Sequence, residues 1–62
     1  MAQHTAEEVL ASSQAVYPQA DSVSKVHPED DQEWWVTDAE YNTFALAWYD
    51  ATDTFNIRPY KP

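Results

Sequence analysis

The segment Glu33–Tyr49 limits the possible folds of this chain more than any other feature. It holds all three tryptophans, two of the four tyrosines and one of the two phenylalanines of a 62-residue sequence. Aromatic rings bury a large apolar area, and a domain of this size buries only about 60% of the surface of its unfolded chain. The sequence has no cysteine and so no disulfide, and the hydrophobic core must therefore come from this segment.

The spacing of apolar residues in the segment fits two secondary structures. Thr37 followed by Glu40 forms a helical capping box. A helix after this cap would place four apolar residues on one face: Tyr41, Phe44, Ala45 and Trp48. A strand over Thr43–Tyr49 would instead place Phe44, Leu46 and Trp48 on one face of a sheet. The alanines favour a helix and the rings favour a strand, so periodicity leaves both open.

An N-terminal helix is predicted with clear boundaries. Thr5 and Glu8 form a second capping box, and an apolar stripe follows, with Ser13 in its middle. Glu7 and Glu8 lie in the first turn, where the helix dipole favours anions. Because Pro18 disfavours helical geometry in the residue before it, the helix should end near Val16.

Short stretches with strand character follow this helix. Residues 19–26 suit an exposed edge strand, residues 27–32 a loop, and residues 33–36 a strand. Residues 54–60 alternate, and Pro59 places the end of that strand at a sheet edge. Since the chain has no glycine, its turns must be longer loops built from Asp, Asn, Thr and Pro. These signals indicate one small domain over residues 1–62 that combines an N-terminal helix with short strands.

The charge balance restricts the partners of the chain. Eleven acidic residues stand against three basic ones, which gives a formal net charge of −8. Nucleic acids and anionic membranes repel such a chain, whereas basic protein surfaces attract it. The sequence has no apolar run long enough to span a membrane and no signal-peptide pattern, so we expect a cytoplasmic protein.

Catalytic chemistry has little support in the sequence. Glu29, Asp30 and Asp31 form the densest carboxylate group, but they lie in a predicted loop without a companion nucleophile, as a solvated acidic loop does. Asp30 and Asp31 with Glu33 lack the spacing of a calcium loop. Nucleotide-binding loops and nucleophile elbows need glycine. We therefore expect a binding protein without catalytic activity, metal or cofactor.

Two stretches resemble the phage inhibitors of uracil-DNA glycosylase. Gln19-Ala20-Asp21-Ser22-Val23 is similar to the Gln-Glu-Ser-Ile strand of that family, and Pro28-Glu29-Asp30 to the Pro-Glu-Glu after it. A later stretch resembles the C-terminal strands of the family through Thr37-Asp38-Ala39-Glu40-Tyr41, Ala45-Leu46, Asp50 and Ile57. Asp21 replaces the glutamate of the family, and this chain is shorter.

The resemblance implies a DNA mimic that binds the DNA-binding groove of the enzyme. Asp21, Ser22 and Val23 would form the edge that enters the groove, with Glu29, Asp30 and Asp31 as the acidic loop after it. An apolar pocket would then receive a leucine of the enzyme, and the resemblance places Leu46 on its wall. From alternation we add Trp34, Phe44 and Trp48 to this pocket. The resemblance also favours a strand over Thr43–Tyr49, which we predict. It thereby implies an α+β fold, with the N-terminal helix packed on a small antiparallel sheet of three or four strands.

Two alternatives remain open. With a helix over residues 38–50, the ending Phe55-Asn56-Ile57-Arg58-Pro59 resembles small phage inhibitors of bacterial RNA polymerase. An open sheet edge would also suit a structural or assembly subunit, because such an edge can pair with another strand.

Overall fold

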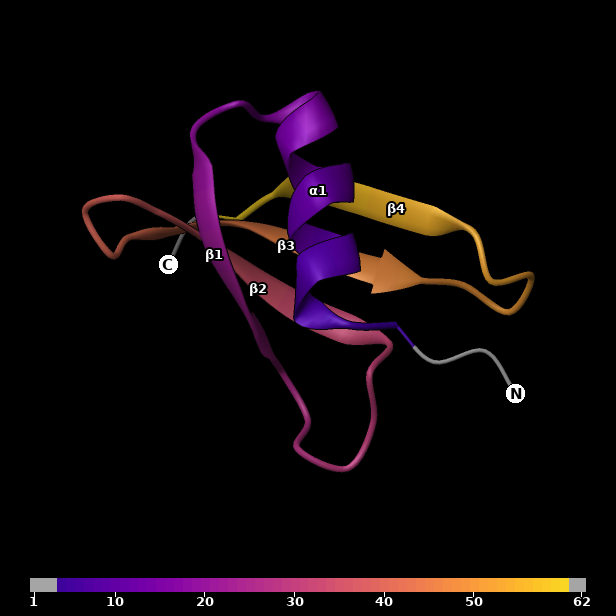
Figure 1. Ribbon diagram of the computed structural model, residues 1–62. Helices are drawn as coiled ribbons and strands as arrows, with labels where there is room; N and C mark the ends of the chain where they lie inside the picture. Colours follow the sequence, from indigo (N-terminus) through magenta and orange to yellow (C-terminus); the bar gives the residue numbers. More distant parts are fainter. Residues whose placement is uncertain (1–3, 61–62) are drawn as a thin grey trace.

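The computed structural model describes residues 4–60 and consists of a helix packed on a four-stranded antiparallel sheet (Figure 1). The elements follow one another along the chain as α1 (Ala6–Val16), β1 (Ala20–Lys25), β2 (Glu33–Asp38), β3 (Thr43–Tyr49) and β4 (Phe55–Pro59). Each strand pairs with the next one in sequence, so the order in the sheet is β1-β2-β3-β4. This α+β arrangement confirms the predicted fold class.

The helix begins and ends where the sequence predicts. The Thr5 side chain caps α1 by accepting a hydrogen bond from the backbone N–H of Glu8 at 3.2 Å. The helix ends at Val16, and Tyr17 has extended geometry before Pro18. Val9 and Ser13 are the buried residues of its inner face, which packs mainly on β1 and β2. Among the described residues, no helix is long and apolar enough to cross a membrane.

The ambiguous segment is a strand. β3 covers Thr43–Tyr49, so the alternative helix over residues 38–50 is wrong. It lies between β2 and β4 in the sheet, and its backbone pairs with a strand on each side. β1 and β4 are the edge strands, and Pro59 lies at the end of β4 as predicted.

The core lies between α1 and the sheet. It is formed by Val9, Ala20, Trp34, Val36, Ala45, Ala47 and Tyr49. Val36, Ala45 and Ala47 have no exposed surface, and these small side chains allow the helix to approach the sheet closely. Within residues 4–60, no helix or strand covers the opposite face of the sheet (Figure 1). We call this the open face.

Two hairpin turns are built in the same way without glycine. An aspartate at the end of the first strand, Asp38 or Asp50, accepts hydrogen bonds from backbone N–H groups two and four residues later, at 2.9–3.1 Å. The third residue after it, Tyr41 or Asp53, has a positive φ of 66° or 62°. Hydrogen bonds from the Thr52 hydroxyl, the Thr54 backbone and the Asn56 amide lower the pKa of Asp50 to about 2. The carboxylates thus replace the glycine that shorter hairpins need.

Candidate functional site

The outer edge of β1 presents the residues that the resemblance singles out. Pairing with β2 skips from Ala20 to Ser22, so Asp21 occupies an irregular position, and both Asp21 and Ser22 are exposed. Val23 pairs with Val36 and packs against the core. The edge therefore exposes a carboxylate and a hydroxyl, while the next residue packs on the core and anchors the strand.

The predicted acidic loop lies beyond the other end of β1. Glu29 is exposed, while Asp30 and Asp31 are half-buried. The Asp30 carboxylate accepts a hydrogen bond from the backbone N–H of Gln32 at 3.1 Å. A strand of six residues spans about 20 Å, so Asp21 and this loop form two separate acidic regions along one edge.

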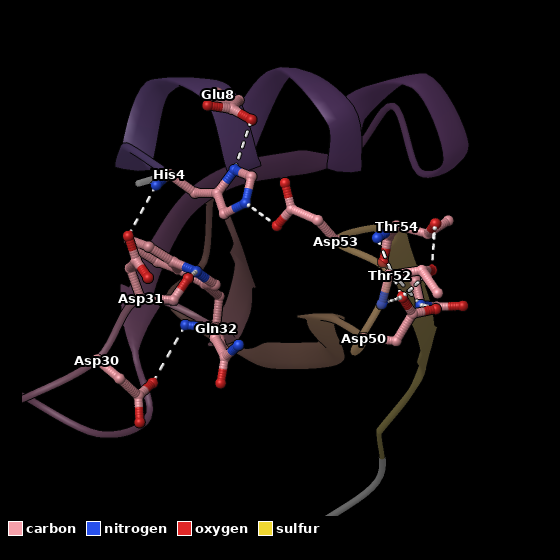
Figure 2. A network of polar contacts seen from close by, with 11 residues as sticks. His4, Glu8, Asp30, Asp31, Gln32, Asp50, Thr52, Asp53 and Thr54 are labelled. Atoms are coloured by element: carbon pink, nitrogen blue, oxygen red, sulfur yellow. Dashed lines mark hydrogen bonds and ion pairs between the residues drawn. The ribbon is translucent and has the colours of Figure 1, made fainter. Parts of the chain in front are cut away.

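A histidine that the sequence analysis passed over brings three carboxylates together. The His4 ring contacts the carboxylates of Glu8 and Asp53, each at 2.7 Å, and its backbone N–H donates to Asp31 at 2.7 Å (Figure 2). These groups come from the start of α1, the β1–β2 loop and the β3–β4 turn. They form an acidic cluster at one end of the molecule, which we call the His4 cluster.

The His4 cluster favours the charged form of the histidine. Carboxylates only accept hydrogen bonds, so both ring nitrogens must carry a proton to satisfy Glu8 and Asp53. The hydrogen bond to Asp53, helped by that to Glu8, raises the pKa of His4 above 6.5 although burial opposes this shift. The ring also stacks on Tyr49, with ring centroids 3.5 Å apart.

Tyr49 lies at the end of the core next to the His4 cluster. Burial raises the pKa of its phenol, and the nearby Glu8 carboxylate adds to the rise. No described residue is placed to hydrogen-bond the buried Tyr49 hydroxyl, so proximity rather than a formed bond to Glu8 accounts for that second effect. Among the described residues, no group of three or more His, Asp or Glu side chains is arranged to hold a metal ion.

The four residues predicted to line one apolar pocket do not come together. Trp34 is only 3% exposed and belongs to the core beneath α1, with its indole N–H donating to the Asp31 carbonyl at 2.7 Å. Phe44 also packs against the core, and its ring meets that of Tyr17 edge to face at 5.6 Å. Leu46 and Trp48 line a hollow with Glu33 and Arg58.

A bulge explains why Phe44 departs from the predicted alternation. Pairing between β2 and β3 passes from Val36–Ala45 to Thr37–Thr43, which leaves Phe44 as an extra residue. Such a bulge interrupts the alternation of side chains. Phe44 therefore turns to the helix side, and the prediction that it shares a face with Leu46 and Trp48 is wrong.

The open face carries Trp35 and Tyr60, which the sequence analysis did not include in the candidate site, beside Leu46, which it did. Trp35 pairs across the sheet with Leu46, which pairs with Arg58 on β4. The rings of Trp35 and Tyr60 lie 4.9 Å apart. Alternation along β2 could have indicated that Trp34 and Trp35 point to opposite faces, but not which of the two faces the helix covers.

Residues within 4–60 line hollows on this open face, and two of these hollows bear on the site. One, of about 490 Å³, is lined by Trp35, Tyr41, Asn42, Thr43 and Tyr60. The other, of about 280 Å³, is the hollow of Leu46 and Trp48, where the Arg58 guanidinium lies 6.0 Å from the centroid of the Trp48 ring. We call the larger one the aromatic hollow.

Comparisons of the chain with models of protein families, with curated proteins and with solved structures find no match. The features of this structure that bear on function are therefore the β1 edge, the His4 cluster and the open face.

Proposed function

We propose that this chain is a small acidic inhibitor that binds the DNA-binding groove of a DNA-processing enzyme, with uracil-DNA glycosylase as the first candidate. The observation that carries the proposal is the outer edge of β1, where Asp21 and Ser22 are exposed while Val23 packs on the core. An inhibitor of this kind acts in the cytoplasm of the host cell, without catalytic turnover.

The chemistry of this edge suits a groove that normally holds a phosphate backbone. Phosphate oxygens in DNA accept hydrogen bonds from backbone N–H groups and from hydroxyl and basic side chains. The Asp21 carboxylate offers the same kind of acceptor, and Ser22 can accept or donate. A hydrogen bond to a charged group contributes about 1.5–3 kcal/mol, so one such contact affects affinity measurably.

The charge of the whole chain supports the same partner. A net charge of −8 attracts a basic groove over a distance, and salt screens this attraction with a Debye length of about 10 Å at 0.1 M. We expect the association rate constant to fall as salt rises, with a smaller change in the dissociation rate constant.

The alternatives have less structural support. The resemblance to phage inhibitors of RNA polymerase depended on a helix over residues 38–50. Because β3 lies there instead, we do not propose that partner. Pairing of the β1 edge with another chain would suit an assembly subunit, but the polar side chains and Lys25 on that strand discourage such pairing.

The test compares two single carboxylate removals. Asp21→Ala is expected to weaken inhibition of uracil-DNA glycosylase about tenfold or more, because about 1.4 kcal/mol corresponds to a factor of ten. Glu7→Ala removes an exposed carboxylate from the first turn of α1 and serves as the matched control. It should cause only a small, salt-dependent loss.

Thermal unfolding of both variants separates binding from folding. If Asp21 only supports the chain after Pro18, Asp21→Ala lowers the melting temperature and leaves inhibition per folded molecule unchanged. Equal inhibition by the two variants would contradict the role of the β1 edge. Capture of RNA polymerase instead of the glycosylase from a bacterial lysate would contradict the choice of partner.

A further inference from the structure

The aromatic hollow lies at the end of the open face near the β2–β3 turn. Rings of Trp35, Tyr41 and Tyr60 line it, together with the polar side chains of Asn42 and Thr43. Tyr41 is 88% exposed and Tyr60 is 37% exposed. These rings therefore have faces that a partner can reach.

Tyr41 is held in a conformation that a tyrosine rarely adopts. Its φ of 66° lies in the left-handed region, where glycine, asparagine and aspartate are tolerated and bulky residues are strained. The equivalent position of the other hairpin holds Asp53, a residue suited to this geometry. Because Tyr41 gains almost no burial in return, its ring is not explained by the stability of the fold, and strain of this kind is typical of functional positions.

The turn that supplies Tyr41 and Asn42 to the hollow is acidic, and negative charge nearby favours a cation. Asp38 and Glu40 belong to the same turn as Tyr41, and the whole chain has a net charge of −8. The faces of aromatic rings attract ammonium and guanidinium groups. The neighbouring hollow already contains such a contact, since Arg58 lies over Trp48 with Glu33 beside it.

We propose that the aromatic hollow binds an arginine side chain of a basic protein partner. The guanidinium plane stacks on the rings, and its N–H groups donate to the Asn42 amide oxygen and the Thr43 hydroxyl. An apolar side chain would remove these two polar groups from water without replacing their hydrogen bonds. The inference rests on the proposed function for the basic character of the partner, but its test does not require that partner.

The experiment is an NMR titration with two capped tripeptides, acetyl-Gly-Arg-Gly-amide and acetyl-Gly-Leu-Gly-amide. The arginine peptide is expected to shift the Trp35 indole N–H and the ring resonances of Tyr41 and Tyr60 in a saturable manner. The leucine peptide is expected to leave them nearly unchanged. Trp35→Leu should abolish the saturable shifts, and Tyr41→Asn should weaken binding about two- to fivefold, as expected for loss of one exposed cation–π contact.

Trp48→Leu is the matched control, because it removes a ring from the other hollow of the same face. It should leave the arginine titration unchanged. Equal shifts with both peptides would overturn the proposal, as would arginine shifts confined to the His4 cluster. Arginine-selective shifts at Trp35 support it even if uracil-DNA glycosylase is not bound. Their absence overturns it even if the glycosylase is inhibited.

Discussion

The two faces of the sheet differ in how they use their large side chains. On the face covered by α1, the rings of Trp34 and Tyr49 are buried, together with the small side chains of Val36, Ala45 and Ala47. On the open face, Trp35, Leu46 and Trp48 are only half-buried, although large rings give the most stabilisation when buried completely. The difference indicates that the covered face stabilises the fold, whereas the open face leaves aromatic surface exposed, as the proposed arginine site requires.

The largest expected effect is a loss of stability, and it should differ between the adjacent residues Trp34 and Trp35. Trp34→Ala removes a ring that is 97% buried in the core and should cost about 3–5 kcal/mol, which is comparable to the whole stability of a domain this small. Trp35→Ala alters the open face and should leave a folded protein with a modest loss of stability. Urea denaturation followed by far-ultraviolet circular dichroism measures both. If Trp35→Ala also unfolds the chain, the open face is part of the folding core.

The sequence predicted the N-terminal helix well because its signals are local. The Thr5 cap and the proline after Tyr17 act within a few residues. They set the ends of α1 at Ala6–Val16. For β3 at Thr43–Tyr49 the local signals left helix and strand open, and the resemblance favoured the strand that the structure has. The exposed Asp21 and Ser22 followed from the polar character of the edge strand.

The rest of the candidate site depends on contacts between distant residues. A bulge turned Phe44 to the helix side, and no local pattern marks it. His4 meets Asp53 across 49 positions of sequence, and Tyr60 meets Trp35 only because β2 and β4 share the open face. Periodicity orders side chains along one strand, but it does not show which face the helix will cover.

A second prediction concerns an unsatisfied polar group between α1 and the sheet face that it covers. The Ser13 hydroxyl is fully buried and has no hydrogen-bond partner among the described residues. A buried unsatisfied group costs about 1–3 kcal/mol, so Ser13→Ala should raise the free energy of unfolding by about 1 kcal/mol. Ser12→Ala is the control, because it brings the same gain in helix propensity at a half-buried position. A stability gain no larger than that of Ser12→Ala would show that the Ser13 hydroxyl is satisfied in solution.

The third prediction tests strain on the open face. Tyr41→Asn places a residue that tolerates positive φ in the β2–β3 turn and should stabilise the protein by about 1 kcal/mol. Tyr41→Phe retains both the ring and the strain, so its melting temperature should match that of the original protein. Differential scanning calorimetry measures the three proteins. Destabilisation by Tyr41→Asn would mean that the ring supports the fold, and the contrast between the two faces would weaken.

The smallest expected effect is a pH dependence of the stability of the fold, and it comes from the His4 cluster. His4 stacks on Tyr49 and faces the carboxylates of Glu8, Asp31 and Asp53. Its pKa in the folded protein is raised above 6.5, so the folded state binds the proton more tightly than the unfolded state. The stabilisation from this group is therefore complete below pH 6.5 and is lost as pH rises through the raised pKa.

His4→Gln should flatten the fall in melting temperature above pH 6.5, because the amide cannot carry the charge that Glu8 and Asp53 attract. His27→Gln is the control: His27 pairs with Glu33 at 2.8 Å in an exposed position, away from Tyr49, and this variant should keep the pH dependence. Thermal unfolding at a series of pH values on both sides of 6.5 tests the pair. If His27→Gln rather than His4→Gln flattens the profile, the proton that stabilises the fold is bound at the β1–β2 loop. The His4 cluster would then contribute acidic surface but no control of stability by pH.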